Sequence, residues 1–307
     1  DLADIEIFIL DIYTPTGSRS FEINIDGNNI FQGTNSTMKV VGFSNDTSSN
    51  LRDKLLKKLK LALVPFLDKG GNVYKYLLKN DKCEVELITY GGIITSIKVP
   101  DLNGNLIDVA LGFNDFDSYL EGHPYFGAIV GRYANRIDNG SFSIDDNDYS
   151  IPINNNGTSL HGGIKGFDKV NWNVVSYDSI NHNSIKLNYL SKHMEEGYPG
   201  NLNTYVTYTL TENNELVIEY QAETDKPTVL NLTQHTYFNL SGESSGDILD
   251  HNLLINADSF LPVNEKIIPT GEIKSVENTP FDFRKIKKIG KDINFEDRQL
   301  KLGKGYD

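Results

Sequence analysis

The chain has 307 residues, of which 38% are hydrophobic and 23% are charged, as in soluble globular proteins and unlike disordered or collagen-like chains. Its formal net charge of −13 repels phosphate backbones, and no apolar run approaches the roughly 18 residues of a membrane span. Nucleic acid is therefore not an expected partner, and the chain is not expected to span a membrane. The single cysteine, Cys83, excludes an intrachain disulfide and a cysteine-clustered zinc site.

Residues 1–47 carry short β-type runs. Phe21 to Ile25 alternates strictly between apolar and polar residues, the turn Asp26-Gly27 follows, and Ile30-Phe31 is again apolar. This order predicts a β-hairpin. The stretch from Tyr13 to Gly27 faintly resembles the strand pair of malectin-like carbohydrate-binding domains, of which it would be only a part.

Residues 48–69 are predicted to form an amphipathic linker helix that ends at Pro65. Leucines recur there at helical spacing among lysines, and they are Leu51, Leu55, Leu56, Leu59 and Leu63. We favour a connecting helix that packs against a neighbouring domain with its lysines in water. A basic helix that binds a membrane surface or a partner protein is the alternative.

From residue 70 to residue 307 hydrophobic residues recur at every second position instead of at helical spacing. The clearest hairpin pairs Thr204–Leu210 with residues 216–222 across Asn213-Asn214. Such strands, separated by Gly- and Asn-rich turns, predict an all-β fold, an antiparallel sandwich or barrel. We find no phosphate-binding loop of the P-loop or dinucleotide type.

The stretch 228–240 contains a candidate site. If it is one strand, its odd positions form a polar face centred on His235, and its even positions, such as Leu230 and Phe238, face the core. Amides, hydroxyls and an imidazole on one face suit a polyhydroxylated ligand, because each sugar hydroxyl both donates and accepts hydrogen bonds. An ordinary solvent-facing strand is the alternative.

Two further motifs contain candidate ligand-binding residues. His161 directly precedes two glycines, which let a loop approach a ligand closely. Arg132, Asn135 and Arg136 form a compact run, and the arginines suit either bidentate bonds to vicinal hydroxyls or a structural ion pair with a carboxylate. We take His123 and the remaining histidines as surface or turn residues. No histidine or aspartate spacing supports a metal site.

Together the motifs from about residue 72 to residue 307 resemble the aldose 1-epimerase, or galactose mutarotase, family. The motifs that carry the resemblance are Tyr90-Gly91-Gly92, Val109-Ala110-Leu111-Gly112-Phe113, Tyr125-Phe126-Gly127, Asn135-Arg136-Ile137, Leu160-His161-Gly162-Gly163, Gly166-Phe167-Asp168-Lys169, Gln234-His235-Thr236-Tyr237-Phe238-Asn239-Leu240, Leu261-Pro262-Val263-Asn264, Thr279-Pro280-Phe281-Asp282 and Gly305-Tyr306-Asp307. The resemblance implies a large antiparallel β-sandwich over residues 70–307, preceded by a small β/helix extension.

The resemblance also implies the residues that act. His235 matches the general acid and His161 a second active-site histidine, while Asn135, Arg136 and Asp307 match residues that bind the sugar. The substrate would be a free monosaccharide such as galactose or glucose. Because mutarotation involves no redox change, no cofactor is expected.

One feature of the family is missing. Its general base is a glutamate beyond the motif that ends at Asp307, so we assign the base to no residue and expect the sandwich to lack its last strands. An acid without its base forfeits about 10²–10⁴-fold in rate. A sugar-binding or regulatory module without turnover is therefore the alternative function. An epimerase of hexose phosphates would need a cationic pocket, and the charge of −13 argues against it.

Overall fold

The computed structural model describes five N-terminal strands and residues 71–306, with side chains from residue 73 onward. It divides into two compact units, residues 1–60 and residues 61–307. The first unit contains one antiparallel sheet of four strands in chain order, β1 (Ile12–Tyr13), β2 (Arg19–Ile25), β3 (Asn28–Thr34) and β4 (Thr37–Val40). The pairing of Ile25 with Asn28 forms the predicted hairpin.

Residues 48–64 of the predicted linker helix lie outside the described residues. The segment 65–68, at the end of the predicted linker, is a strand, β5 (Pro65–Asp68). It pairs with the next strand, with Pro65 opposite Tyr74. The division of the N-terminal residues into a β segment and a linker stays a prediction.

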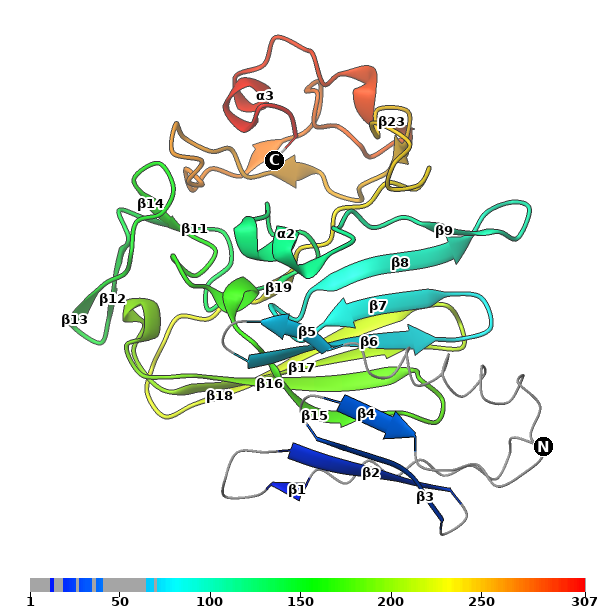
Figure 1. Cartoon of the computed structure of the whole chain (residues 1–307). Helices are drawn as coiled ribbons and strands as arrows, with labels where there is room; N and C mark the ends of the chain where they lie inside the picture. The colour runs from blue at the N-terminus through cyan, green and yellow to red at the C-terminus, as the bar shows by residue number, and fades with distance from the viewer. Residues whose placement is uncertain are drawn as a thin grey trace. The chain divides into compact units, whose positions relative to one another are not determined.

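Two antiparallel sheets dominate the second unit, and each follows the chain from neighbour to neighbour (Figure 1). The first sheet contains β5, β6 (Gly71–Lys79), β7 (Glu84–Ile88), β8 (Ile94–Pro100) and β9 (Leu106–Asp108). The second contains β15 (Asn173–Tyr177), β16 (Ser184–Ser191), β17 (Leu202–Leu210) and β18 (Leu216–Thr224). The predicted hairpin is β17–β18, with Leu210 opposite Leu216.

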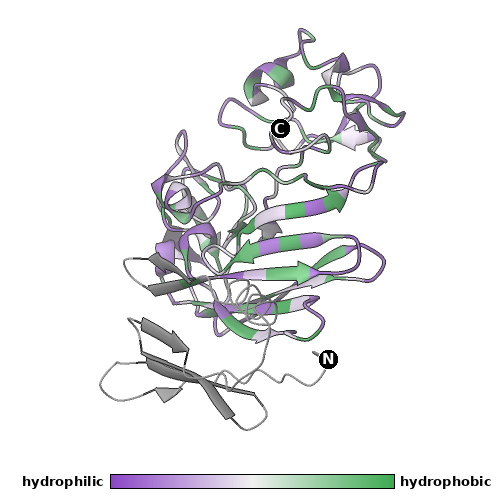
Figure 2. Ribbon diagram, turned by 45° about the vertical axis from the view of Figure 1, so that its right-hand side comes forward, coloured by the Kyte–Doolittle hydropathy of each residue, from purple (hydrophilic) through white to green (hydrophobic). Residues whose placement is uncertain are grey.

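The main hydrophobic core lies between these two sheets. Along β17 every second residue is buried, including Val206 and Tyr208, and these pack with Leu87 of β7 and Leu187 of β16. Figure 2 shows the same alternation as green and purple bands along the strands. The Tyr208 hydroxyl donates a hydrogen bond to the Gly92 carbonyl across the core, at 2.9 Å. The predicted antiparallel sandwich is confirmed.

Short elements fill the rest of the second unit. They are α2 (Phe116–Glu121), β10 (Ile129–Val130), β11 (Arg136–Asp138), β12 (Ser141–Ile144), β13 (Asn147–Ser150), β14 (Thr158–Leu160), η1 (Phe167–Lys169), η2 (Glu195–Gly197), β19 (Thr233–Gln234), β20 (Asn252–Leu253), β21 (Ser259–Phe260), β22 (Lys274–Ser275), β23 (Lys287–Lys288), η3 (Ile289–Lys291) and α3 (Arg298–Gly303). Within the described part of the chain, no helix is long and apolar enough to cross a membrane.

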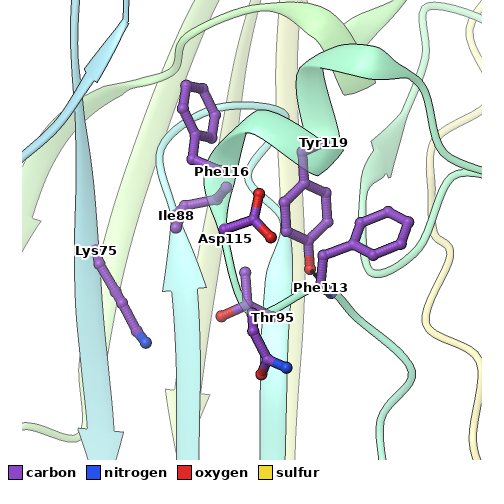
Figure 3. Close-up of a pocket in the computed structure, with 8 residues that line it drawn as sticks. Lys75, Ile88, Thr95, Phe113, Asp115, Phe116 and Tyr119 are labelled. Carbon is purple, nitrogen blue, oxygen red and sulfur yellow. Dashed lines mark hydrogen bonds between the residues drawn. The ribbon is translucent and has the colours of Figure 1, made fainter.

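Helix α2 begins at Asp115, whose side chain accepts a hydrogen bond from the Ser118 backbone amide and so caps the helix. Its buried residues Phe116 and Tyr119 pack with Ile88 and Ile93 in a second, smaller core cluster. A small pocket lies beside this helix, lined by residues of β6, β7, β8 and the segment 113–119 (Figure 3). None of the six histidines lines it.

The stretch 228–240 is not the single strand that its alternating pattern predicts. Only Thr233–Gln234 is a strand, and the flanking residues form isolated bridges, Asn231 with Tyr133 and Phe238 with Ala110. Each change of partner resets the direction of the side chains. The even positions consequently do not share one face: Leu230, Phe238 and Leu240 are 42%, 52% and 65% exposed, whereas Leu232 packs against the main core.

Gly127 joins this stretch to the first sheet. Its amide donates to the His235 carbonyl at 3.2 Å, and its own carbonyl accepts from the Ile94 amide at 2.8 Å. Its φ is 61°, and a Cβ there would lie 1.9 Å from the Ile94 carbonyl oxygen. Only glycine allows this approach of the two backbones.

We predict that Gly127→Ala destabilises the chain far more than Gly104→Ala. Both glycines have positive φ, so each alanine costs about 1–2 kcal/mol in backbone strain. A Cβ at Gly104 meets nothing within 4 Å, whereas at Gly127 overpacking adds about 1–3 kcal/mol. Urea unfolding of the two variants measures the difference, and equal losses would contradict the close approach.

Candidate active site

Backbone pairing fixes the position of His235. Strand β10 pairs with β19 in antiparallel register, with Ile129 opposite Gln234. The next residue, His235, continues this pairing, because its amide donates to the Ala128 carbonyl at 2.9 Å. The imidazole therefore projects from a segment whose backbone is bonded to the β10 region.

His161 is held by a second pairing, between β11 and β14, in which Arg136 lies opposite Leu160. The His161 amide donates to the Asn135 carbonyl at 2.9 Å, and the Asn135 amide donates back to His161 Nδ1 at 3.0 Å. Because Nδ1 accepts, the neutral ring carries its proton on Nε2. At Gly162 a Cβ would lie 1.9 Å from the Gly131 carbonyl oxygen, so glycine permits the turn that follows His161.

These two pairings bring the two imidazoles together. The ring centroids of His161 and His235 are 5.2 Å apart, with the planes nearly perpendicular at 87°. Tyr125 contacts both rings, at 4.5 Å from His161 and 5.6 Å from His235. Tyr237 lies 5.1 Å from His235. Residues far apart in the sequence thus form one cluster of aromatic and imidazole rings, which we call the histidine cluster: Tyr125, His161, His235 and Tyr237.

The backbone around this cluster adopts unusual conformations. Tyr125, Asn135 and His161 have φ of 62°, 61° and 55°, the left-handed region that non-glycine residues rarely enter. Such conformations cost of order 1–3 kcal/mol each and concentrate at functional sites. Three of the fourteen described non-glycine residues with positive φ thus lie at the histidine cluster, and together with the paired imidazoles they indicate the candidate active site.

The electrostatic surroundings favour neutral His161. Burial, and to a smaller extent the nearby His235, Arg136 and Lys169, together lower its pKa from 6.5 to about 4. Removing an imidazole from water disfavours its charged form, and neighbouring cations do the same. At neutral pH His161 is therefore an uncharged ring that can donate a hydrogen bond through Nε2.

Asn135 and Arg136 lie beside the histidine cluster. The Arg136 Nη1 donates to the Asn135 side-chain oxygen at 3.1 Å, while its Nε is buried and has no hydrogen-bond partner among the described residues. Neither arginine of the motif, Arg132 or Arg136, forms an ion pair with a carboxylate of the described chain. Asp307 lies outside the described residues.

Arg132 has a structural position instead. It is 1% exposed, and its Nη1 donates to the carbonyls of Pro199 and Gly200 at 2.7 and 3.0 Å and to the Thr228 hydroxyl at 3.2 Å. Its Nη2 donates to the Ser191 hydroxyl at 2.7 Å. Both predicted alternatives for Arg132, sugar binding and an ion pair, are therefore wrong, because backbone carbonyls and hydroxyls take up its guanidinium.

Several residues of the cluster's surroundings were not predicted from the sequence. Tyr125 packs on both histidines, and Lys169 Nζ lies 5.3 Å from the Tyr125 ring centroid. His123, predicted to be a surface or turn residue, has both ring nitrogens buried, and its ring contacts Tyr119 at 5.6 Å. Burial lowers the His123 pKa. In the sequence Tyr125 and Lys169 lie in motifs that contain a glycine. That position does not show which rings they contact.

Comparison with known proteins gives consistent matches. A family model described as aldose 1-epimerase matches residues 74–307. The galactose mutarotase of Sus scrofa is 48% identical over 224 residues, which cover 73% of this chain and 64% of that protein. The aldose 1-epimerase of Escherichia coli (strain K12) is 38% identical over 245 residues, which cover 79% of this chain and 69% of that protein. The chain thus spans less than two thirds of the length of the mammalian relative.

Solved structures agree with these matches. The crystal structure of galactose 1-epimerase from Lactobacillus acidophilus NCFM matches with a TM-score of 0.70 at 32% identity, over 80% of this chain and 71% of that one. A homologue from C. elegans matches with a TM-score of 0.68 at 34% identity, over 72% and 67% of the two chains. The architecture of the second unit is therefore that of these proteins.

We predict that protonation of His161 weakens the fold at acidic pH. In the unfolded chain this ring titrates near 6.5 and in the folded chain near 4, so between these values the unfolded state binds more protons. The free energy of unfolding therefore falls as the pH drops from about 6.5 to about 4.

The variant His161→Asn measures this contribution, because its side-chain oxygen can still accept the Asn135 amide. Urea unfolding at about pH 7 and about pH 5 should show a smaller loss of stability for this variant than for the original chain. An equal loss in both would contradict the lowered pKa.

Proposed function

Because the chain belongs to the aldose 1-epimerase family, we propose that it interconverts the α and β anomers of a free hexose such as galactose or glucose. The observation that carries the proposal is the juxtaposition of His161 and His235, 5.2 Å apart. Beside these rings lie Asn135 and Arg136, whose amide and guanidinium groups suit sugar hydroxyls. One small polyhydroxylated ligand could contact all four residues.

Interconversion of anomers needs two proton transfers. A base removes the proton of the anomeric hydroxyl while an acid protonates the ring oxygen, so the bond between the anomeric carbon and the ring oxygen breaks and an aldehyde forms. The bond to the anomeric carbon then rotates, and the ring closes on the other face of the aldehyde. Ring closure returns both protons. Oxidation states do not change, so this reaction requires no redox cofactor.

In our proposal His235 is the acid that protonates the ring oxygen. An imidazole is suited to give and regain a proton near neutral pH. His161, neutral and with its proton on Nε2, donates a hydrogen bond toward the same oxygen without adding a charge. Its lone pair on Nδ1 is already occupied by the Asn135 amide, which fixes the ring for this role.

Binding of the sugar is assigned to three residues. Arg136 carries a planar fork of donors that suits neighbouring hydroxyls, and its buried Nε has no partner among the described residues. Asn135 and Asp307 complete the set, the latter by resemblance alone. The base stays unassigned, since the glutamate that serves in the family has no counterpart in matching context in this sequence.

Polarimetry tests the proposal. We predict that the chain speeds the change in optical rotation of freshly dissolved α-D-galactose, and that His235→Asn lowers this rate to that of buffer, because it removes the proposed general acid. His182→Asn is the control, because His182 lies outside the cluster and contacts Tyr177.

The unassigned base requires a second measurement. The chain fused to the remaining C-terminal segment of the Sus scrofa relative should be faster than the chain alone, because it would supply the glutamate. Equal, substantial rates in both would show that the added segment does not supply the base. A rate no better than buffer in both would contradict the proposed activity itself.

A further inference from the structure

An ion pair lies next to the histidine cluster. Lys169 Nζ is 2.5 Å from Asp168 Oδ2, and the Asp168 side chain is 1% exposed whereas that of Lys169 is 38% exposed. The second oxygen, Oδ1, is buried and has no hydrogen-bond partner among the described residues. A buried carboxylate is stable only beside a positive charge, so Asp168 holds the Lys169 ammonium in place.

The backbone that carries this pair is fixed on both sides. The Phe167 amide donates to the Gly131 carbonyl at 3.0 Å, and the Gly91 amide donates to the Val170 carbonyl at 2.7 Å. The Phe167 ring is buried in the main core. Lys169 therefore projects from a segment bonded to two others, rather than from a free loop.

From this position Lys169 reaches the histidine cluster. Its Nζ lies 5.3 Å from the centroid of the Tyr125 ring, within the range of a cation–π interaction. The same Tyr125 ring contacts His161 at 4.5 Å and His235 at 5.6 Å. The ion pair, the tyrosine and the two imidazoles thus form one continuous set of contacts.

We propose that Lys169, anchored by Asp168, is a positioning residue that holds the Tyr125 ring against His161 and His235 and places a fixed positive charge beside them. The inference rests on the proposed function only in treating the two histidines as the groups that act on the sugar. Lys169 itself does not need to touch the substrate.

The charge has a direct consequence for His161. The groups that face its ring are the imidazole of His235, the Arg136 guanidinium, the Lys169 ammonium and the Tyr125 ring, and both cations lower its pKa. Arg136 remains when Lys169 is changed, so the contribution of Lys169 can be separated. His161 must be neutral to act as the uncharged hydrogen-bond donor of the proposed function.

The test is an NMR titration of the His161 ring protons in the full chain, assigned with His161→Asn. We expect Lys169→Met to raise the titration midpoint by about half a pH unit, the effect of one unit charge through partly hydrated protein. We also expect the nuclear Overhauser contact between the Tyr125 ring and the His161 ring to weaken. Lys169→Arg, which keeps the charge and the stem, should preserve both.

Lys186→Met is the matched control, because Lys186 also lies over a tyrosine ring, 4.7 Å from the centroid of Tyr205, outside the histidine cluster. It should change neither readout. If Lys169→Met leaves Asp168 uncompensated and the chain fails to fold, the double variant Asp168→Asn with Lys169→Met removes both charges. The same loss of the contact between Tyr125 and His161 is then expected.

Two outcomes would overturn the inference: a folded variant without Lys169 whose midpoint and ring contact are unchanged, or Lys169→Arg that alters both as much as Lys169→Met. Neither readout uses sugar or turnover. Failure of the polarimetric test therefore leaves this inference standing, and failure here leaves the proposed function standing.

Discussion

The candidate site depends on the hydrogen bonds that the buried Arg132 guanidinium donates. This guanidinium gathers carbonyls and hydroxyls of residues 191–200 and of Thr228 around one cation, and burial lowers its pKa. Its neighbour Gly131 accepts the amide of Phe167. Thr228, which precedes His235, and Phe167, which follows His161, are thereby both held by the segment Gly131-Arg132, outside the histidine cluster.

The two imidazoles of the cluster have different surroundings, and this difference matters for the proposed reaction. His161 is fixed by a reciprocal pair of hydrogen bonds with the Asn135 backbone and is neutral at physiological pH because of burial and nearby cations. His235 projects from the end of β19, against Tyr125 and Tyr237. This difference agrees with the proposed roles, in which His161 is a fixed hydrogen-bond donor and His235 transfers the proton.

Much of the fold could be predicted from the sequence, because strands that bury one face show a period of two. The β17–β18 hairpin is an example, since its alternation and its Asn213-Asn214 turn lie within one short stretch. The stretch 228–240 could not be predicted this way, because it pairs with three different segments in turn, and the pattern along the chain does not show which segment pairs with which residue. For the same reason the sequence indicates His161 and His235 but not Tyr125 or Lys169, whose relation to them exists only in three dimensions.

The left-handed residues Tyr125, Asn135 and His161 have a consequence for engineering. Glycine at any of them would relieve the backbone strain, but it would also remove a side chain that contacts a histidine ring or Arg136, and it would increase the entropy of the unfolded chain. Variant libraries of this scaffold should therefore hold these three codons constant.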